Sequence, residues 1–96
     1  MTEEEFQQLV EETIFIYERF IPGAATATRE MIVRRGVIQA LSSLVQNANI
    51  QRGFRILRDN NMLNRTFEQL IVDNPEFFDT TTIECARFRL EHHGDL

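Results

Sequence analysis

Apolar residues in this chain recur every three or four positions, in stretches that glycine, proline or asparagine residues interrupt. This spacing places the apolar side chains along one face of an α-helix. No stretch alternates apolar and polar residues with the period of two that marks a strand, and no Asn-Gly hairpin turn occurs. The spacing therefore predicts an all-α fold in which short helices pack their apolar faces together.

Capping patterns and interruptions divide the chain into helices. A threonine followed three residues later by a glutamate, the pattern of a capping box, occurs at Thr2 and Glu5 and again at Thr81 and Glu84. Pro22 ends the stretch that begins at Thr2, and Pro75 ends the one that begins at Thr66, because the residue before a proline disfavours helical backbone. Six helices are predicted from these boundaries, at about residues 3–20, 28–35, 37–47, 50–59, 66–73 and 81–93.

The segment 28–47 leaves one alternative open. The apolar face changes phase near Gly36, which favours two helices, but a single kinked helix would fit the same residues. In either case, five or six short helices account for the 96 residues. A chain of this length forms one domain more readily than two, so the sequence predicts a single compact bundle.

The charged residues are unevenly distributed along the chain. The formal net charge is −5, and phosphate repels an acidic protein, which disfavours general nucleic-acid binding. The first 20 residues carry six acidic residues and one arginine, whereas residues 29–65 carry seven arginines and two acidic residues. All ten basic residues are arginine. Codon composition, a need for planar bidentate contacts and avoidance of lysine modification each explain a lysine-free chain.

Residues suited to catalysis or metal binding do not occur at the spacing that such sites need. Cys85 and His92 would lie about 10 Å apart along one helix, and the adjacent His92 and His93 would point about 100° apart. The acidic residues of the first helix lie on an exposed face, where nothing would separate their pKa values for acid–base catalysis. No phosphate-binding loop, nucleophile elbow or zinc-ligand spacing occurs. We therefore expect a protein that is not an enzyme and holds no cofactor or metal.

The sequence also bears on where the protein works. Cys85 is the only cysteine, so no internal disulfide can form and a reducing compartment is favoured. The first residues are acidic where a signal peptide would be basic, and no apolar run approaches the roughly 18 residues that a membrane span needs. We therefore expect an unprocessed cytoplasmic protein without a membrane partner.

An aromatic residue is out of phase with the apolar face of the first predicted helix. Phe15 lies about 180° from Phe6 on the helical wheel, since successive residues turn by about 100°. Its neighbours there include an acidic face, which we define as Glu11, Glu12 and Glu18. The acidic face is either simply solvated or attracts a basic partner, and Phe15 is either a tolerated surface ring or a partner contact.

Two features near the other end of the chain are similarly ambiguous. The predicted helix 50–59 carries an arginine face, defined as Arg52, Arg55 and Arg58, which is either solvated or contacts an acidic partner. The last predicted helix has a second apolar side that includes Phe88. This helix is therefore either sandwiched between neighbours or exposes Phe88 to another subunit.

These features together predict a non-enzymatic interaction or adaptor module that binds another protein or a second copy of itself. In this hypothesis the acidic face and the arginine face steer the partners, and the two displaced phenylalanines are the anchors. The alternative is a small nucleic-acid-binding regulator that uses the arginine face together with Arg34 and Arg35. A third possibility, a small apolar ligand held between helices, would leave no recognisable pattern in the sequence.

Overall fold

The first helix begins and ends where local sequence patterns place its boundaries. The computed structural model describes residues 1–96, and α1 spans Glu3–Phe20. The Thr2 hydroxyl accepts a hydrogen bond from the Glu5 amide at 3.1 Å, and the Glu5 carboxylate accepts one from the Thr2 amide at 2.9 Å. The predicted capping box is therefore confirmed. The helix ends at Ile21, whose extended backbone is the conformation favoured before proline.

Gly36 divides the next helical segment into two helices. α2 spans Thr26–Arg35 and α3 spans Val37–Gln46, and between them Gly36 has φ 84° and ψ 160°. These angles lie in a region that is essentially restricted to glycine. Two helices, rather than one kinked helix, are thus present. α2 begins two residues before the predicted position, after a turn in which the Thr26 amide donates to the Gly23 carbonyl.

Replacing Gly36 with alanine is expected to lower the free energy of unfolding by about 1–3 kcal/mol, because a Cβ atom is strained at this backbone conformation. A Cβ atom at Gly36 would meet no atom within 4 Å, so backbone strain alone would cause the loss. Gly94→Ala is the matched control, because its site is equally open and has no positive φ. Chemical denaturation of both variants measures the difference, and equal stabilities would contradict this role for Gly36.

The fourth helix is shorter than predicted, and the fifth is close to its predicted length. α4 spans Arg52–Asp59 and begins two residues later than expected, because a turn in which the Ile50 amide donates to the Asn47 carbonyl occupies the preceding residues. α5 spans Phe67–Asp73, with Thr66 as its N-cap.

The sixth helix, α6, spans Thr80–Glu91. The capping box predicted at Thr81 and Glu84 is wrong: the N-cap is Asp79, whose carboxylate accepts a hydrogen bond from the Thr82 amide at 2.8 Å. An aspartate in this position also places a negative charge at the positive end of the helix, which favours the earlier start. Three short 3₁₀ helices that periodicity did not reveal follow α4, α5 and α6, at Leu63–Arg65, Pro75–Phe77 and His93–Asp95.

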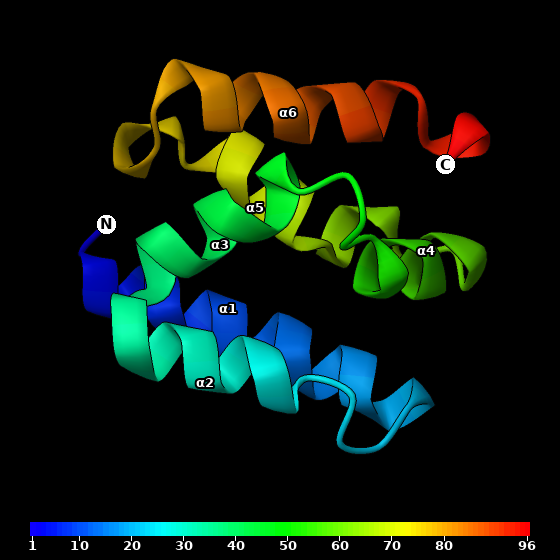
Figure 1. Ribbon diagram of the computed structural model, residues 1–96, viewed down its shortest axis with the longest axis horizontal. Helices are drawn as coiled ribbons and strands as arrows, with labels where there is room; N and C mark the ends of the chain where they lie inside the picture. The colour runs from blue at the N-terminus through cyan, green and yellow to red at the C-terminus, as the bar shows by residue number, and fades with distance from the viewer.

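The helices form three layers in Figure 1, with α6 outermost on one side, α3, α4 and α5 between, and α1 and α2 on the other side. The predicted all-α bundle is confirmed, since six α-helices and no strand are present. The Cα radius of gyration is 12.2 Å. A globular chain of this length is expected to have a radius of about 12.5 Å, so the helices form one compact body.

The hydrophobic core lies beside the first turns of α1. Phe6, Val10 and Ile14 are completely buried there, and they pack against buried residues of α3, α5 and α6. The Phe6 ring is tilted against Phe77 and meets Phe78 edge-on, with ring centroids 5.1 Å and 5.6 Å apart. The core extends from these first turns to Ala25, which follows α1, and Tyr17 of the last turns packs against it.

Candidate functional site

Phe15 is exposed on the outer face of α1, as its phase on the helical wheel predicts. Its side chain is 65% exposed. A shallow hollow surrounds it, lined by Glu11, Glu12, Ile16 and Arg65. The Glu12 carboxylate is 3.9 Å from the Arg65 guanidinium, and both side chains remain largely exposed. Phe15 is therefore an isolated aromatic residue within a charged surface, not part of the core.

The rest of the acidic face is engaged within the molecule. The Arg29 guanidinium on α2 donates to Glu11 at 2.8 Å and to Glu18 at 3.0 Å, so it bridges α1 and α2. Glu18 also accepts a hydrogen bond from the Ala25 amide at 3.1 Å. The hydrogen bonds from Arg29 and then Ala25 lower the pKa of the Glu18 carboxyl below its ordinary value. Sequence reasoning did not single out Arg29, because its position on α2 gives no sign of which helix it faces.

Stability should fall in acid partly through Glu18. Because its pKa is lower in the folded chain than the ordinary 4.5, its contribution is complete above that pH and is lost as the pH falls through the lowered value. Glu18→Gln should therefore reduce the difference between denaturation midpoints measured at about pH 6 and about pH 3. Glu30→Gln, at an exposed glutamate of α2, is the control and should leave that difference unchanged.

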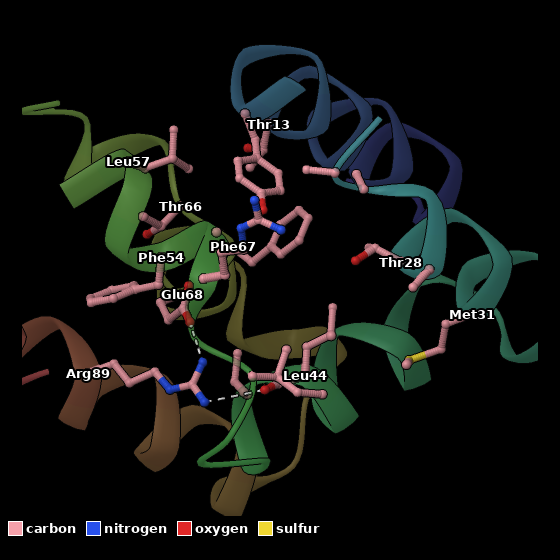
Figure 2. A pocket seen from close by; sticks show the side chains of 18 residues that line it. Thr13, Thr28, Met31, Leu44, Phe54, Leu57, Thr66, Phe67, Glu68 and Arg89 are labelled. Atoms are coloured by element: carbon pink, nitrogen blue, oxygen red, sulfur yellow. Dashed lines mark hydrogen bonds and ion pairs between the residues drawn. The ribbon is translucent and has the colours of Figure 1, made fainter. Parts of the chain in front are cut away.

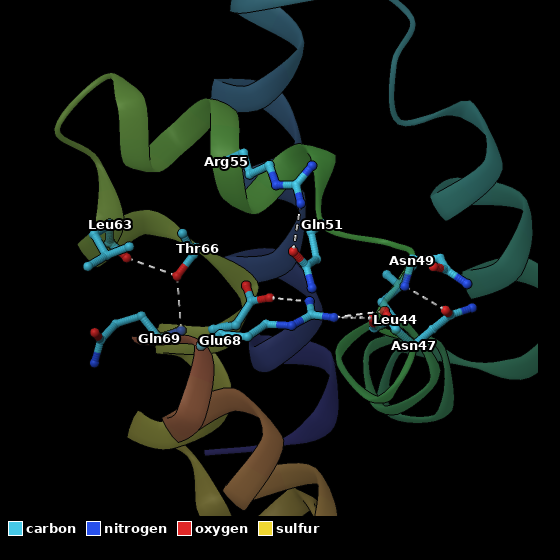
Figure 3. Close-up of polar contacts among 10 residues, drawn as sticks. Leu44, Asn47, Asn49, Gln51, Arg55, Leu63, Thr66, Glu68 and Gln69 are labelled. Atoms are coloured by element: carbon cyan, nitrogen blue, oxygen red, sulfur yellow. Dashed lines mark hydrogen bonds and ion pairs between the residues drawn. The ribbon is translucent and has the colours of Figure 1, made fainter. Parts of the chain in front are cut away.

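One member of the arginine face also binds within the molecule. The Arg58 guanidinium donates to the carbonyl oxygens of His93 and Leu96, each at 2.6 Å, and to the Asp59 carboxylate at 2.9 Å. Arg58 thus ties α4 to the C-terminal residues. By contrast, Arg55 donates only to Gln51, at 3.1 Å, as Figure 3 shows.

The arginines of the nucleic-acid alternative do not gather on one surface. Arg34 and Arg35 are on the last turn of α2, and that end of α2 and α4 lie at opposite ends of the long axis in Figure 1. With Arg58 directed to the C-terminal carbonyls, Arg52 and Arg55 are the exposed remainder of the arginine face. A continuous phosphate-binding track would need more than these two guanidinium groups.

Phe88 is exposed as well, on the outer helix α6. Its side chain is 56% exposed, and its ring lies against His92 with centroids 4.4 Å apart. α6 covers α3 and α5 on one side only, so it is not sandwiched between neighbours. Because α1 and α6 are in opposite outer layers in Figure 1, Phe15 and Phe88 belong to separate surfaces.

A pocket of about 320 Å³, which we call the central pocket, opens between the α1–α2 pair and α4, and it was not predicted from the sequence. Figure 2 shows the side chains that line this space, with those of α1, α2, α3 and α4 on different sides of it. Eleven of the eighteen lining residues are hydrophobic, so the pocket suits an apolar group. At its rim lie Ala27, Ile50 and Arg52, all of which are exposed. Tyr17 lies against Gly53, where a Cβ atom would come within 3.7 Å of the ring.

A buried ion pair forms part of the pocket wall. Arg89 of α6 donates to the Glu68 carboxylate of α5 at 2.8 Å, and the two side chains are 6% and 5% exposed. The same guanidinium donates to the carbonyl oxygens of Asn47 at 2.8 Å and Leu44 at 3.3 Å, at the C-terminal end of α3 (Figures 2 and 3). Burial raises the pKa of Glu68 above its ordinary value, although the hydrogen bond from Arg89 opposes the increase.

The phase of these two charged residues could have revealed the pair. Glu68 lies three residues before the buried Ile71, and Arg89 lies three residues after the buried Ala86, so each charge is on an apolar face. Charged residues are almost never fully buried unless they are paired. The sequence does not show that these two apolar faces meet, because one belongs to α5 and the other to α6.

The pocket contains few groups that could perform chemistry. Its lining includes no histidine or cysteine, and its one carboxylate, Glu68, is already paired with Arg89. Across the molecule, no three His, Cys, Asp or Glu side chains converge in a way that could hold a metal ion. The arrangement is suited to holding an apolar group rather than to transferring a proton.

No protein-family model, curated protein or solved structure matches this chain. None of its helices combines the length and the hydropathy that crossing a membrane requires. The pocket and the exposed surfaces are therefore the features of this chain that bear on its function.

Proposed function

We propose that this chain is a non-enzymatic module that binds another protein by taking an apolar side chain of the partner into the central pocket. The observation that carries this proposal is the pocket itself, at about 320 Å³ with a mainly hydrophobic lining. Binding energy in protein interfaces concentrates where an anchor residue fills a desolvated pocket. A receptor of this kind gives a small domain one strong contact without a large flat interface.

The dimensions and the rim of the pocket support a side chain as its occupant. At about 30 Å³ for each water-sized group, the space holds roughly ten non-hydrogen atoms, the size of a large aliphatic or aromatic side chain. Ile50, which is 40% exposed, adds apolar surface at the rim. Because Arg89 and Glu68 form an ion pair with each other, a side chain bound in the pocket need not supply a polar group to either of them.

Cys85 supports the cytoplasm as the place of action. It is the only cysteine of the chain and is unpaired. Free cysteines persist in reducing compartments, whereas extracellular proteins tend to pair them.

Indole, as a mimic of an aromatic side chain, tests whether the pocket accepts an apolar group. We expect saturable NMR shifts at the methyl groups of Leu44 and Leu57, which line the pocket. Ala27→Trp should abolish these shifts, because the new ring would occupy the pocket from an exposed position of α2. Ala48→Trp, at an exposed alanine outside this pocket, is the control and should leave them intact. Absence of saturable shifts, or equal shifts in both variants, would contradict the proposal.

A further inference from the structure

We infer that the partner is a second copy of this chain, and that its Phe15 enters the central pocket. This inference rests on the proposed function of the pocket and names what fills it. Three observations carry it: the size and exposure of Phe15, the charges beside Phe15 and beside the pocket, and the positions of both on α1.

Phe15 is the most exposed phenylalanine of the chain, ahead of Phe88 and Phe20. It is 65% exposed and has no aromatic neighbour of its own. Its seven side-chain carbons require roughly 200 Å³, at about 30 Å³ per water-sized group. The pocket has a volume of about 320 Å³, so the ring would fit and leave room for the aliphatic part of a neighbouring side chain. Phe88 is less available, since its ring is already stacked on His92.

The charges that flank the two surfaces are complementary. Glu12 lies one turn before Phe15, its side chain is 61% exposed, and its nearest cation, Arg65, is 3.9 Å away. At the pocket rim, Arg52 is exposed and makes no ion pair within the chain. Arg55 follows it by three residues on α4. Docking Phe15 would therefore bring the Glu12 carboxylate of one copy toward the Arg52 guanidinium of the other, which favours encounter and register.

The position of Phe15 relative to the pocket determines how copies would assemble. Thr13 and Tyr17 of α1 line the pocket, and each is two residues from Phe15. Two residues turn a helix by about 200°, so Phe15 and the pocket lie on opposite sides of α1. The contact is then between two different surfaces. Such a head-to-tail contact joins copies into open chains or rings, whereas a closed two-fold dimer needs one surface to meet itself.

Complementation between two variants tests this arrangement. Phe15→Ala keeps the pocket but lacks the inserted ring, and Ala27→Trp keeps the ring but blocks the pocket. In analytical ultracentrifugation we expect the unaltered chain to form larger species as its concentration rises. Each variant alone should stay monomeric, and their mixture should form a 1:1 dimer that grows no further.

Two outcomes would overturn the inference. One is an unaltered chain that remains monomeric at millimolar concentration, and the other is a mixture of variants that stays monomeric. If indole nevertheless binds the pocket, the pocket remains a receptor and only the identity of the occupant is wrong. If indole does not bind either, the proposed function fails as well. Should Ala27→Trp not fold, a competition experiment takes its place. Excess indole must then dissociate the assembly of the unaltered chain if Phe15 occupies the pocket.

A charge exchange tests the register of the contact. Glu12→Arg and Arg52→Glu should each weaken association by about fivefold or more, because each leaves like charges facing across the interface. The double variant should restore association, since the pair is reversed rather than removed. Arg87→Glu, at an exposed position of α6, is the control and should change little. A double variant no better than the single ones would overturn the assigned register.

Discussion

Arg89→Ala is expected to lower the free energy of unfolding by about 3–5 kcal/mol, because breaking a buried ion pair leaves the remaining charge without compensation. The carbonyl oxygens of Leu44 and Asn47 would lose their guanidinium donor at the same time. Burial already raises the pKa of Glu68, so without Arg89 that carboxyl should take up a proton more readily. A domain of this size has a total stability of about 5–14 kcal/mol, so the melting temperature should fall sharply.

Two further variants separate the ion pair from its packing. Arg87→Ala removes an exposed arginine from the same helix and should change stability by less than about 0.5 kcal/mol. The double variant Glu68→Leu with Arg89→Met removes both charges and should be more stable than Arg89→Ala, because apolar residues of similar volume often replace a buried pair at little cost. Equal losses for Arg87→Ala and Arg89→Ala, measured by denaturant titration, would show that the buried pair does not join α3, α5 and α6.

Phe6→Ala is the second large effect, with an expected loss of about 3–5 kcal/mol through the cavity it leaves. Phe6 is completely buried, and it packs against Phe77 and Phe78. Phe15→Ala makes the same chemical change on the same helix at an exposed position. It should alter stability by less than about 0.5 kcal/mol in dilute solution, where no association contributes. Similar losses in the two variants would mean that α1 buries a different face.

The predictable parts of this fold depend on residues within about four positions of one another. The capping box at Thr2 and Glu5 places the start of α1 correctly, and the phase change near Gly36 separates α2 from α3. The error at Thr81 has the same origin, because Asp79 offers a competing cap only two residues away. Local patterns thus located the helices, and where they failed, another local pattern was the stronger one.

The candidate site was only partly predictable, and the reason is distance along the chain. Exposure of Phe15 follows from its phase on one helix. The engagement of Glu18 by Arg29 and of Arg58 by the C-terminal carbonyls depends on contacts between helices, which no spacing in the sequence encodes. The pocket is lined by residues from all six helices, so it exists only once those helices are packed.

The sequence by itself determined that this chain forms short helices, which faces of them are apolar, and that Phe15 lies outside the core. Tertiary structure alone decided that Arg89 is buried against Glu68, and that Glu11, Glu18 and Arg58 bind partners within the chain. It also decided that a pocket opens beside α4. Helix formation responds to neighbours one turn away. Burial of a charge, and the shape of the space between helices, depend on which faces meet.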